Sequence, residues 1–226
     1  MYDFHTHTFL SDGVLSPLEL IRRAQVQGYR VIGVTDHVGV GNLDFVVKTL
    51  VTDCALATKR WDILAVPGVE ITHVPKDDID QVAKAAKKAG AKLVIVHGET
   101  IVEPVEEGTN EAAVRSTAVD VLAHPGLITY EVARLAAENG VYLEITARKG
   151  HSLANGHVVR MAQRARATMV LDSDAHEPED LLTYDLVTKV AEGAGLSNEE
   201  THALLQLNPQ NLLAKLGFGP VSAAHS

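Results

Sequence analysis

The sequence predicts an α/β protein whose strands form a closed (β/α) barrel, and three observations favour this fold class. Short apolar runs alternate along the chain with longer amphipathic stretches. The runs are rich in Val, Ile and Leu and lack a strict apolar–polar alternation, which is typical of parallel strands buried on both faces. With 226 residues, 46% of them hydrophobic, the chain can bury one full core. A doubly wound open sheet is the alternative, and both folds place the functional site at the carboxyl ends of the strands.

Seven apolar runs are the candidate strands. They span residues 2–5, 29–37, 61–70, 91–97, 120–124, 141–146 and 167–176. The first helix is expected to start after Ser16, because Ser16, Pro17 and Glu19 combine an N-cap, a first-turn proline and a capping box, and to end at Gly28. Further helices are expected over residues 42–60, 80–91, 129–140, 197–207 and 208–217. No linker or low-complexity segment divides the chain, so we expect one domain over residues 1–226.

Composition limits the expected partners and compartment. Lys and Arg number 20 against 29 Asp and Glu, and the net charge of −9 disfavours a large nucleic-acid or membrane-binding surface. Cys54 is the one cysteine, which excludes an internal disulfide and favours a reduced, cytoplasmic setting. The sequence has no apolar stretch of ~18 residues, so no membrane partner is expected. It carries no signal for an oligomeric state.

Titratable side chains gather at the ends of the candidate strands. Six of the seven runs end in a histidine or a carboxylate, namely His5, Asp36 with His37, Glu70, His97, His124, and Asp174 with His176. In a parallel barrel these side chains would all point into one mouth. Imidazoles and carboxylates are costly to bury together, whereas a metal ion makes them favourable ligands. The pattern therefore predicts a metal centre at the mouth of the barrel.

The spacing of these residues also suits metal binding. His5 and His7 are two residues apart in an extended chain, so their side chains lie on the same side and can chelate one ion. Asp174 and His176 repeat this arrangement in the last run. Asp12 lies in an Asp-Gly turn that we expect to fold back over the first strand. The full set of candidate ligands is His5, His7, Asp12, His37, Glu70, His97, His124, Asp174 and His176.

The size of this set indicates more than one ion. At about four or five protein ligands per ion, nine candidates suit two or three divalent ions. Glu70 is the expected bridging ligand, because it is the glutamate that ends a run among other candidate ligands. Mixed imidazole and carboxylate donors suit Zn, Mn or Fe, and the sequence does not choose among them.

Six segments together resemble the PHP (polymerase and histidinol phosphatase) family. They are HTHTFLSDG (5–13), TDH (35–37), GVEIT (68–72), the isolated His97, AHPG (123–126) and DSDAH (172–176). The resemblance implies a distorted, seven-stranded, TIM-like (β/α) barrel with up to three metals. It also implies a ligand assignment, with His5, His7, Glu70 and Asp174 for the first ion, Glu70, His97 and His124 for the second, and Asp12, His37 and His176 for the third. The segment RKGHSLANG (148–156) is similar to stand-alone, histidinol-phosphatase-like members.

The activity expected from this resemblance is hydrolysis of a small phosphorylated metabolite, a phosphomonoester. A metal-bridging hydroxide would attack the phosphorus in line. The residues expected to hold that hydroxide are His5, His7, Glu70 and Asp174.

Four other residues are candidates for substrate binding. Arg148 and Lys149 follow the sixth run, and a guanidinium can bind a phosphate through two parallel hydrogen bonds. His73 and His151 lie near the ends of predicted strands and are further candidates for contact with the substrate. His202 and His225 lie near the C-terminus and are not expected to be ligands.

Other functions remain as alternatives. A phosphodiesterase or nuclease acting on nucleotides would use a similar centre, although the negative charge disfavours a long nucleic-acid track. Amidohydrolases also carry a His-x-His pair, but they usually have an eighth strand and often a carboxylated lysine between their metals. A non-catalytic metal-binding module is disfavoured, because structural sites are closed, usually four-coordinate and often rich in cysteine.

Overall fold

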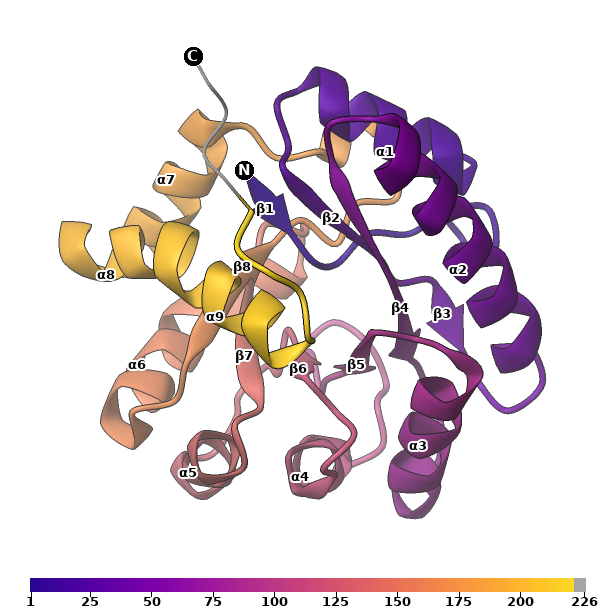
Figure 1. Cartoon of the computed structure of the whole chain (residues 1–226). Helices are drawn as coiled ribbons and strands as arrows, with labels where there is room; N and C mark the ends of the chain where they lie inside the picture. The colour runs from indigo at the N-terminus through magenta and orange to yellow at the C-terminus, as the bar shows by residue number, and fades with distance from the viewer. Residues whose placement is uncertain (222–226) are drawn as a thin grey trace.

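A parallel sheet curls into a nearly closed barrel in the computed structural model, which describes residues 1–221 (Figure 1). The strands are β1 Tyr2–Asp3, β2 Val31–Val34, β3 His37–Val38, β4 Leu64–Ile71, β5 Leu93–His97, β6 Val121–Ala123, β7 Tyr142–Thr146 and β8 Met169–Asp172. Neighbouring strands follow the order β1-β2-β4-β5-β6-β7-β8, and β3 lies beside β4. Strand order thus follows chain order, without the reversal that marks a doubly wound sheet. The predicted distorted, TIM-like (β/α) barrel is confirmed.

The second predicted run is interrupted, which adds β3 to the expected seven strands. The break falls at Thr35 and Asp36, between β2 and β3. The Asp36 carboxylate accepts hydrogen bonds from the Thr8 backbone N–H at 2.8 Å, the Thr8 hydroxyl at 2.8 Å and the Ser11 hydroxyl at 2.7 Å. These bonds tie the loop after β1 to the end of β2. Beyond the break, His37 lies opposite Glu70 of β4.

The barrel closes between the residues that follow β1 and those that follow β8. Thr6 and Ala175 form an isolated parallel bridge, and the His7 backbone N–H donates to the Ala175 carbonyl at 2.8 Å. Side chains alternate along extended chain, so the residues flanking each bridge partner lie on one side of the sheet. The seam therefore places the His5-x-His7 pair beside the Asp174-x-His176 pair.

Helices alternate with the strands and cover the outside of the barrel (Figure 1). They are α1 Pro17–Val26, α2 Leu43–Arg60, α3 Ile79–Ala89, α4 Thr109–Arg115, α5 Tyr130–Asn139, α6 Asn155–Ala165, α7 Tyr184–Gly193, α8 Asn198–His202 and α9 Asn208–Lys215, with short helical turns η1 Lys76–Asp78, η2 His151–Ala154, η3 Pro178–Asp180 and η4 Ala203–Leu207. Ser16 caps α1 as the sequence predicts, but the Glu19 carboxylate pairs with Arg23 and does not complete the predicted capping box. Ser197 forms a capping box with Glu200 at the start of α8. Helices α4, α6 and α7 add to the predicted set. His202 ends α8, and His225 lies outside the described residues.

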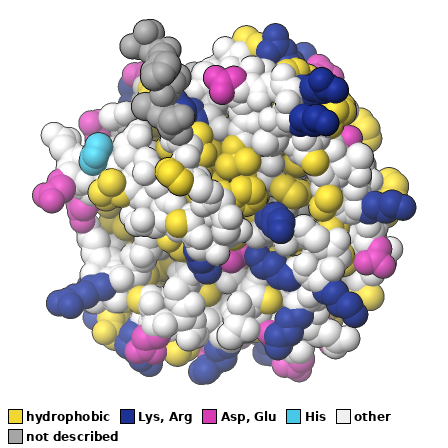
Figure 2. Space-filling view, viewed as in Figure 1, with side chains coloured by type: hydrophobic (Ala, Val, Ile, Leu, Met, Phe, Trp, Pro, Cys, Tyr) yellow, Lys and Arg dark blue, Asp and Glu magenta, His cyan; other side chains and the backbone are white. Residues whose placement is uncertain are grey.

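Apolar side chains fill the barrel interior and close its amino end. The interior cluster contains Phe4, Val31, Val66, Leu93, Ile95, Val121 and Val170, together with Leu212 and Leu213 of α9. The Asn208 side-chain amide donates to the carbonyl of Met169, the first residue of β8, which places α9 at the amino end of the barrel. Figure 2, viewed as in Figure 1, shows hydrophobic side chains interspersed with charges of both signs and little histidine. The polar mouth of the barrel therefore lies at the other end, where the strands have their carboxyl ends.

None of the helices described over residues 1–221 combines the length and the apolarity needed to cross a lipid bilayer.

Candidate metal centre

All nine predicted ligands lie at the carboxyl ends of the barrel strands or in the loops that follow them. Glu70 and His97 are the last or next-to-last residues of β4 and β5, His37 begins β3, and His124 follows β6 directly. The remaining ligands flank the seam between β1 and β8 or lie in the loop after β1, and they are His5, His7, Asp12, Asp174 and His176. Six of the nine are buried, the His176 and His37 side chains are 11% and 25% exposed, and the Asp12 side chain is 54% exposed.

Four predicted ligands of the first ion converge at the seam. His7 Nε2 lies 3.2 Å from Asp174 Oδ1 and 3.6 Å from Glu70 Oε2. His5 Nε2 lies 3.4 Å from Glu70 Oε1 and 3.8 Å from Asp174 Oδ1. Ligand atoms of His5, His7 and Asp174 all lie within 4.8 Å of one another. The structure therefore brings this set together around one centre.

A second group forms at the exposed side, around Asp12. Its carboxylate oxygens lie 3.5 Å from His37 Nε2 and 3.2 Å from His176 Nε2, and His7 completes a four-residue group. Asp12 reaches this position because the Asp-Gly turn folds back as predicted, with the Gly13 N–H donating to the Thr8 carbonyl at 2.9 Å. A Cβ at Gly13 would lie 2.5 Å from the His7 carbonyl oxygen, so the turn requires glycine.

The predicted ligands of the second ion are less closely grouped. His124 Nε2 lies 3.5 Å from Glu70 Oε1, and these atoms group with His5. The His97 ring lies 4.5 Å from that of His124, measured between centroids, but its Nε2 faces Glu103 Oε2 at 3.1 Å. His124 groups in addition with His151 and Asp174. Glu103 and His151 are thus neighbours of this centre that the ligand assignment does not contain.

The chemistry of the cluster fits divalent ions. Two atoms bonded to one ion at about 2.1 Å, with an angle of about 90–110° between them, lie roughly 3.0–3.4 Å apart. The imidazole–carboxylate separations given above run from 3.1 to 3.8 Å, so they lie within this range or slightly above it. Among the described residues, His5 Nε2, both ring nitrogens of His7, and Glu70 Oε1 are buried without a hydrogen-bond partner. Unpaired buried polar atoms are costly, and metal coordination would satisfy them.

The electrostatics of the cluster are mixed. Burial lowers the pKa of His7 to about 3 and that of His97 to about 4, so both imidazoles are neutral at pH 7. Burial also disfavours charge on His37, but Glu70 and Asp12 outweigh it and raise the pKa of His37 to about 10. Burial would raise the pKa of Glu70, whereas the neighbouring histidines hold it well below its usual range. A cation would therefore find His7 and His97 already neutral and able to coordinate it. It would also displace the proton from His37.

Three side chains that orient histidines were not assigned from the sequence. Glu144 of β7 places Oε2 2.7 Å from His5 Nδ1, and both side chains are fully buried. The hydroxyls of Thr72 and Thr100 lie 2.6 Å from Nδ1 of His37 and His151 respectively. These contacts leave Nε2 of each ring facing the cluster, which is the usual way a protein orients a metal-binding histidine. His37 Nδ1 in addition lies 2.7 Å from Glu70 Oε2.

Two further carboxylates lie beneath the cluster and hold the seam. Asp3 Oδ1 accepts from the backbone N–H of Ser173 at 3.1 Å and of His5 at 3.3 Å. Asp172 Oδ1 accepts from the Phe4 N–H at 2.6 Å. Burial raises the pKa of Asp3 to about 6, and burial together with Asp3 raises that of Asp172 well above its usual range. These carboxylates position the backbone of the ligand strands.

Backbone strain is concentrated at the centre. Four non-glycine residues among those described have positive φ, and three of them are His73 at 52°, His124 at 25° and Asp174 at 53°. Such conformations cost about 1–3 kcal/mol each and persist where the surroundings impose them. The strain at His124 and Asp174 indicates that the site needs these two side chains to point in fixed directions.

A cavity of about 280 Å³ opens above the cluster. It is lined by Asp12, His37, Thr72, His73, His97, Glu103, Arg148, His151, Asp174 and His176. Three of the four predicted substrate-binding residues therefore lie on its wall, namely His73, Arg148 and His151. Lys149, the fourth, is exposed and is not part of the lining. Arg148 Nη1 is held by Asp180 Oδ2 at 3.1 Å.

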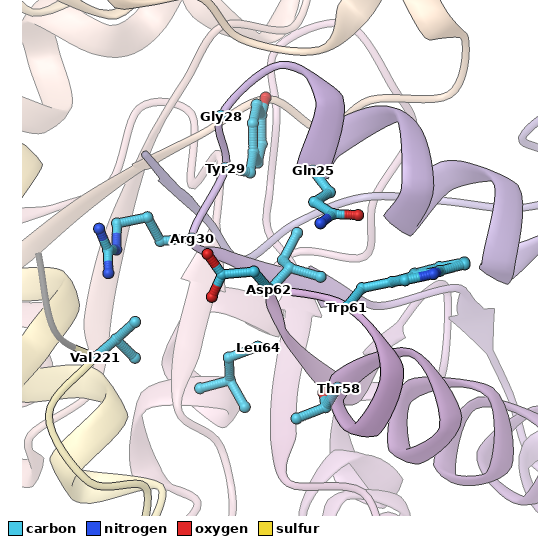
Figure 3. Close-up of a pocket in the computed structure, with 10 residues that line it drawn as sticks. Gln25, Gly28, Tyr29, Arg30, Thr58, Trp61, Asp62, Leu64 and Val221 are labelled. Carbon is cyan, nitrogen blue, oxygen red and sulfur yellow. The ribbon is translucent and has the colours of Figure 1, made fainter. Parts of the chain in front are cut away.

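A second pocket, of about 370 Å³, lies away from the histidines (Figure 3). It is lined by residues that precede β2 and β4, including Arg30 and Trp61, and by Val221. Figure 3 shows Arg30 and Asp62 entering it from these two segments. Because these segments come before their strands, the pocket belongs to the amino end of the barrel, and none of the nine candidate ligands lines it.

Comparisons with known proteins give one family model and several related sequences. A family model described as the PHP domain matches residues 3–148. An uncharacterized protein of Methanocaldococcus jannaschii is 46% identical over 217 residues, which cover 95% of this chain and 99% of the relative. A probable phosphatase of Shewanella sp. (strain ANA-3) is 27% identical over 229 residues, covering 93% and 89% of the two chains.

Solved structures extend the comparison. A structure reported for metal-dependent tyrosine phosphatases of Bacillus subtilis and Streptococcus pneumoniae matches with a TM-score of 0.63 at 18% identity and covers 100% of both chains. A chain of archaeal ribonuclease P, solved with mature tRNA, matches with a TM-score of 0.61 at 17% identity and covers 100% and 97%. At these identities the structural matches show a shared fold and do not select a substrate.

Proposed function

Because the chain belongs to the PHP domain family, we propose that it is a metal-dependent phosphoesterase that hydrolyses a small-molecule phosphomonoester. The observation that carries this proposal is a set of overlapping imidazole and carboxylate groups, formed by eight of the nine predicted ligands together with His151, beneath one cavity of about 280 Å³. A cavity of this volume suits a small metabolite better than a polymer track, and the net charge of −9 disfavours a nucleic-acid partner. The probable phosphatase of Shewanella supports the same class of reaction.

The residues would divide the work between ion binding and substrate binding. His5, His7, Glu70 and Asp174 would hold one ion, Glu70, His97 and His124 a second, and Asp12, His37 and His176 a third. When bound, divalent Zn, Mn or Fe ions would supply an activated water and positive charge against the phosphoryl oxygens. Arg148 and His73 line the cavity and would bind the phosphate, with Lys149 attracting it from outside.

The buried network beneath the cluster would keep these groups in place. Glu144 would hold His5 in the tautomer that presents Nε2, and Asp3 would fix the backbone of His5 through its N–H. Without a cation, some imidazoles of the site are neutral and others, such as His37, are protonated. The protonated imidazoles would balance the negative charge of carboxylates such as Glu70. We further propose that the protein works as one domain in the cytoplasm, consistent with its single cysteine.

The test is a substrate comparison with protein of measured metal content. The metal-loaded protein is assayed with p-nitrophenyl phosphate, bis(p-nitrophenyl) phosphate and short single-stranded RNA, followed by a panel of sugar, nucleotide and amino-alcohol phosphates. Faster turnover of the monoester than of the diester and RNA is expected. Preference for the diester or RNA would instead support a phosphodiesterase or nuclease. Bound metal without turnover of any ester would support a non-catalytic metal-binding module.

A further inference from the structure

Glu103 is a carboxylate that faces the centre from the loop between β5 and α4. Its Oε2 lies 3.1 Å from His97 Nε2, and its Oε1 lies 3.4 Å from His151 Nε2. His73 Nε2 lies 3.9 Å from Oε2 on the outer side. The Glu103 side chain is 38% exposed, whereas His97 and His151 are buried. One carboxylate thus spans two imidazoles at the border between the cluster and the cavity.

His151 is oriented in the same manner as the predicted ligands. Its Nδ1 lies 2.6 Å from the buried Thr100 hydroxyl, which leaves Nε2 for other partners. A ligand atom of His151 lies within 4.8 Å of ligand atoms of His124 and Asp174. The His151 ring stacks on that of His124 with a centroid distance of 4.3 Å. His151 therefore lies within the cluster of candidate metal ligands.

The loop that carries Glu103 is anchored by other carboxylates. Glu99 Oε1 accepts from the backbone N–H groups of Gly108 at 3.0 Å and Asn110 at 2.8 Å. Glu106 Oε2 accepts from the Lys76 N–H at 3.0 Å. These bonds hold both ends of the loop. The Glu103 carboxylate, by contrast, pairs with the imidazoles of His73, His97 and His151. Its separations of 3.1 and 3.4 Å match those of two ligands that share an ion.

We propose that Glu103 and His151 are additional metal ligands, which complete the coordination of an ion shared with His97 and His124 on the open side of the centre. His151 would be a permanent ligand, because it is buried and held by Thr100. Glu103 is the exposed member of the pair, so it is the ligand that an incoming phosphoryl oxygen would replace. The inference rests on the proposed metal centre but not on the identity of the substrate.

Metal binding by isosteric variants tests this assignment without any substrate. Metal-free wild type, Glu103→Gln and His151→Gln are titrated with Co²⁺, and calorimetry and visible absorption give the number of ions, their affinities and the coordination of each. Both variants should bind one ion at least about 10-fold more weakly than wild type, with a changed absorption band. The other ions should bind unchanged. Glu107→Gln is the matched control, because Glu107 is an exposed residue of the same loop, and it should bind Co²⁺ like wild type.

Two results would overturn the assignment in different ways. If both variants bind every ion with wild-type affinity and spectrum, Glu103 and His151 form only an ion pair. If wild type itself binds no Co²⁺, the proposed centre fails, and this inference fails with it. Thermal unfolding of each metal-free variant establishes that any loss of affinity comes from a folded protein.

Discussion

His5 Nδ1 lies 2.7 Å from Oε2 of Glu144, and the side chains of both residues are completely buried. The contact joins the first strand region to β7 across the barrel interior. It leaves His5 Nε2 facing Glu70, so the orientation of a candidate ligand depends on a carboxylate that binds no ion in the proposed assignment. Partners of this kind commonly alter metal affinity by about 10–100-fold.

Replacing Glu144 should therefore weaken metal binding. Glu144→Gln keeps an acceptor for the His5 Nδ1–H group but removes the charge that makes the imidazole a stronger ligand, so we expect affinity for the seam ion to fall about 10-fold. Equilibrium dialysis with metal analysis measures this. Glu138→Gln, on the exposed face of α5, is the control. Equal affinities for the two variants would contradict the role given to Glu144.

Glu70 should be required for more than one ion, because its two carboxylate oxygens face His5, His7, His37 and His124. Glu70→Gln should lower the number of tightly bound ions by two and phosphoesterase activity by more than ~100-fold. Metal content by mass spectrometry, measured beside the exposed Glu131→Gln variant, checks the first part. Loss of only one ion would show that Glu70 is not a bridging ligand.

Much of this centre is predictable from sequence because its ligands terminate strands. His5, His7, Asp174 and His176 follow from the two-residue period of extended chain, and the barrel needs only to close for them to meet. The existence of the strands was also predictable, since short runs rich in Val, Ile and Leu alternate with longer amphipathic stretches.

Features set by distant hydrogen bonds were not predictable. The break in the second run reflects the Asp36 carboxylate turning toward Thr8 and Ser11, which no local pattern shows. Glu103 lies in an irregular loop, so neither helical nor strand periodicity marks it. Glu144 sits inside a buried strand, and its partner His5 is 139 residues away in the chain.

Metal binding at pH 7 should release protons. His37 has its pKa raised to about 10 by Glu70 and Asp12 against the effect of burial, so it is protonated in the metal-free protein, and coordination requires the neutral ring. Lowering the pH should accordingly weaken binding. Calorimetric titration with Zn²⁺ in two buffers of different ionisation enthalpy measures the protons released. Identical heats in both buffers would show that no proton leaves.

Arg148 should affect substrate affinity more than metal content. Hydrogen bonds to charged groups contribute about 1.5–3 kcal/mol, so Arg148→Ala should raise KM for p-nitrophenyl phosphate roughly 10- to 100-fold with unchanged bound metal. Lys149→Ala is the matched comparison and should have a smaller effect, because Lys149 does not line the cavity. Unchanged kinetics for Arg148→Ala would remove this residue from the site.

Asp3 should make stability depend on pH. Burial raises its pKa from 3.8 to about 6, so between these values the folded protein binds a proton that the unfolded chain has lost. The free energy of unfolding of wild type, relative to Asp3→Asn, should thus fall as the pH rises from about 4 to about 6 and then level off. Urea unfolding of the metal-free proteins at several pH values tests this, with the exposed Asp44→Asn as control. A constant difference would contradict the raised pKa.

The bridge between Thr6 and Ala175 has a consequence for how the molecule is made. Thr6 cannot pair until Ala175, which follows the last barrel strand, has been synthesised. Binding of an ion at the proposed centre would consequently come late in biosynthesis, after the two ends of the barrel have met. A truncation just before Asp174 would keep all the barrel strands and yet remove the Asp174 and His176 side chains from the seam.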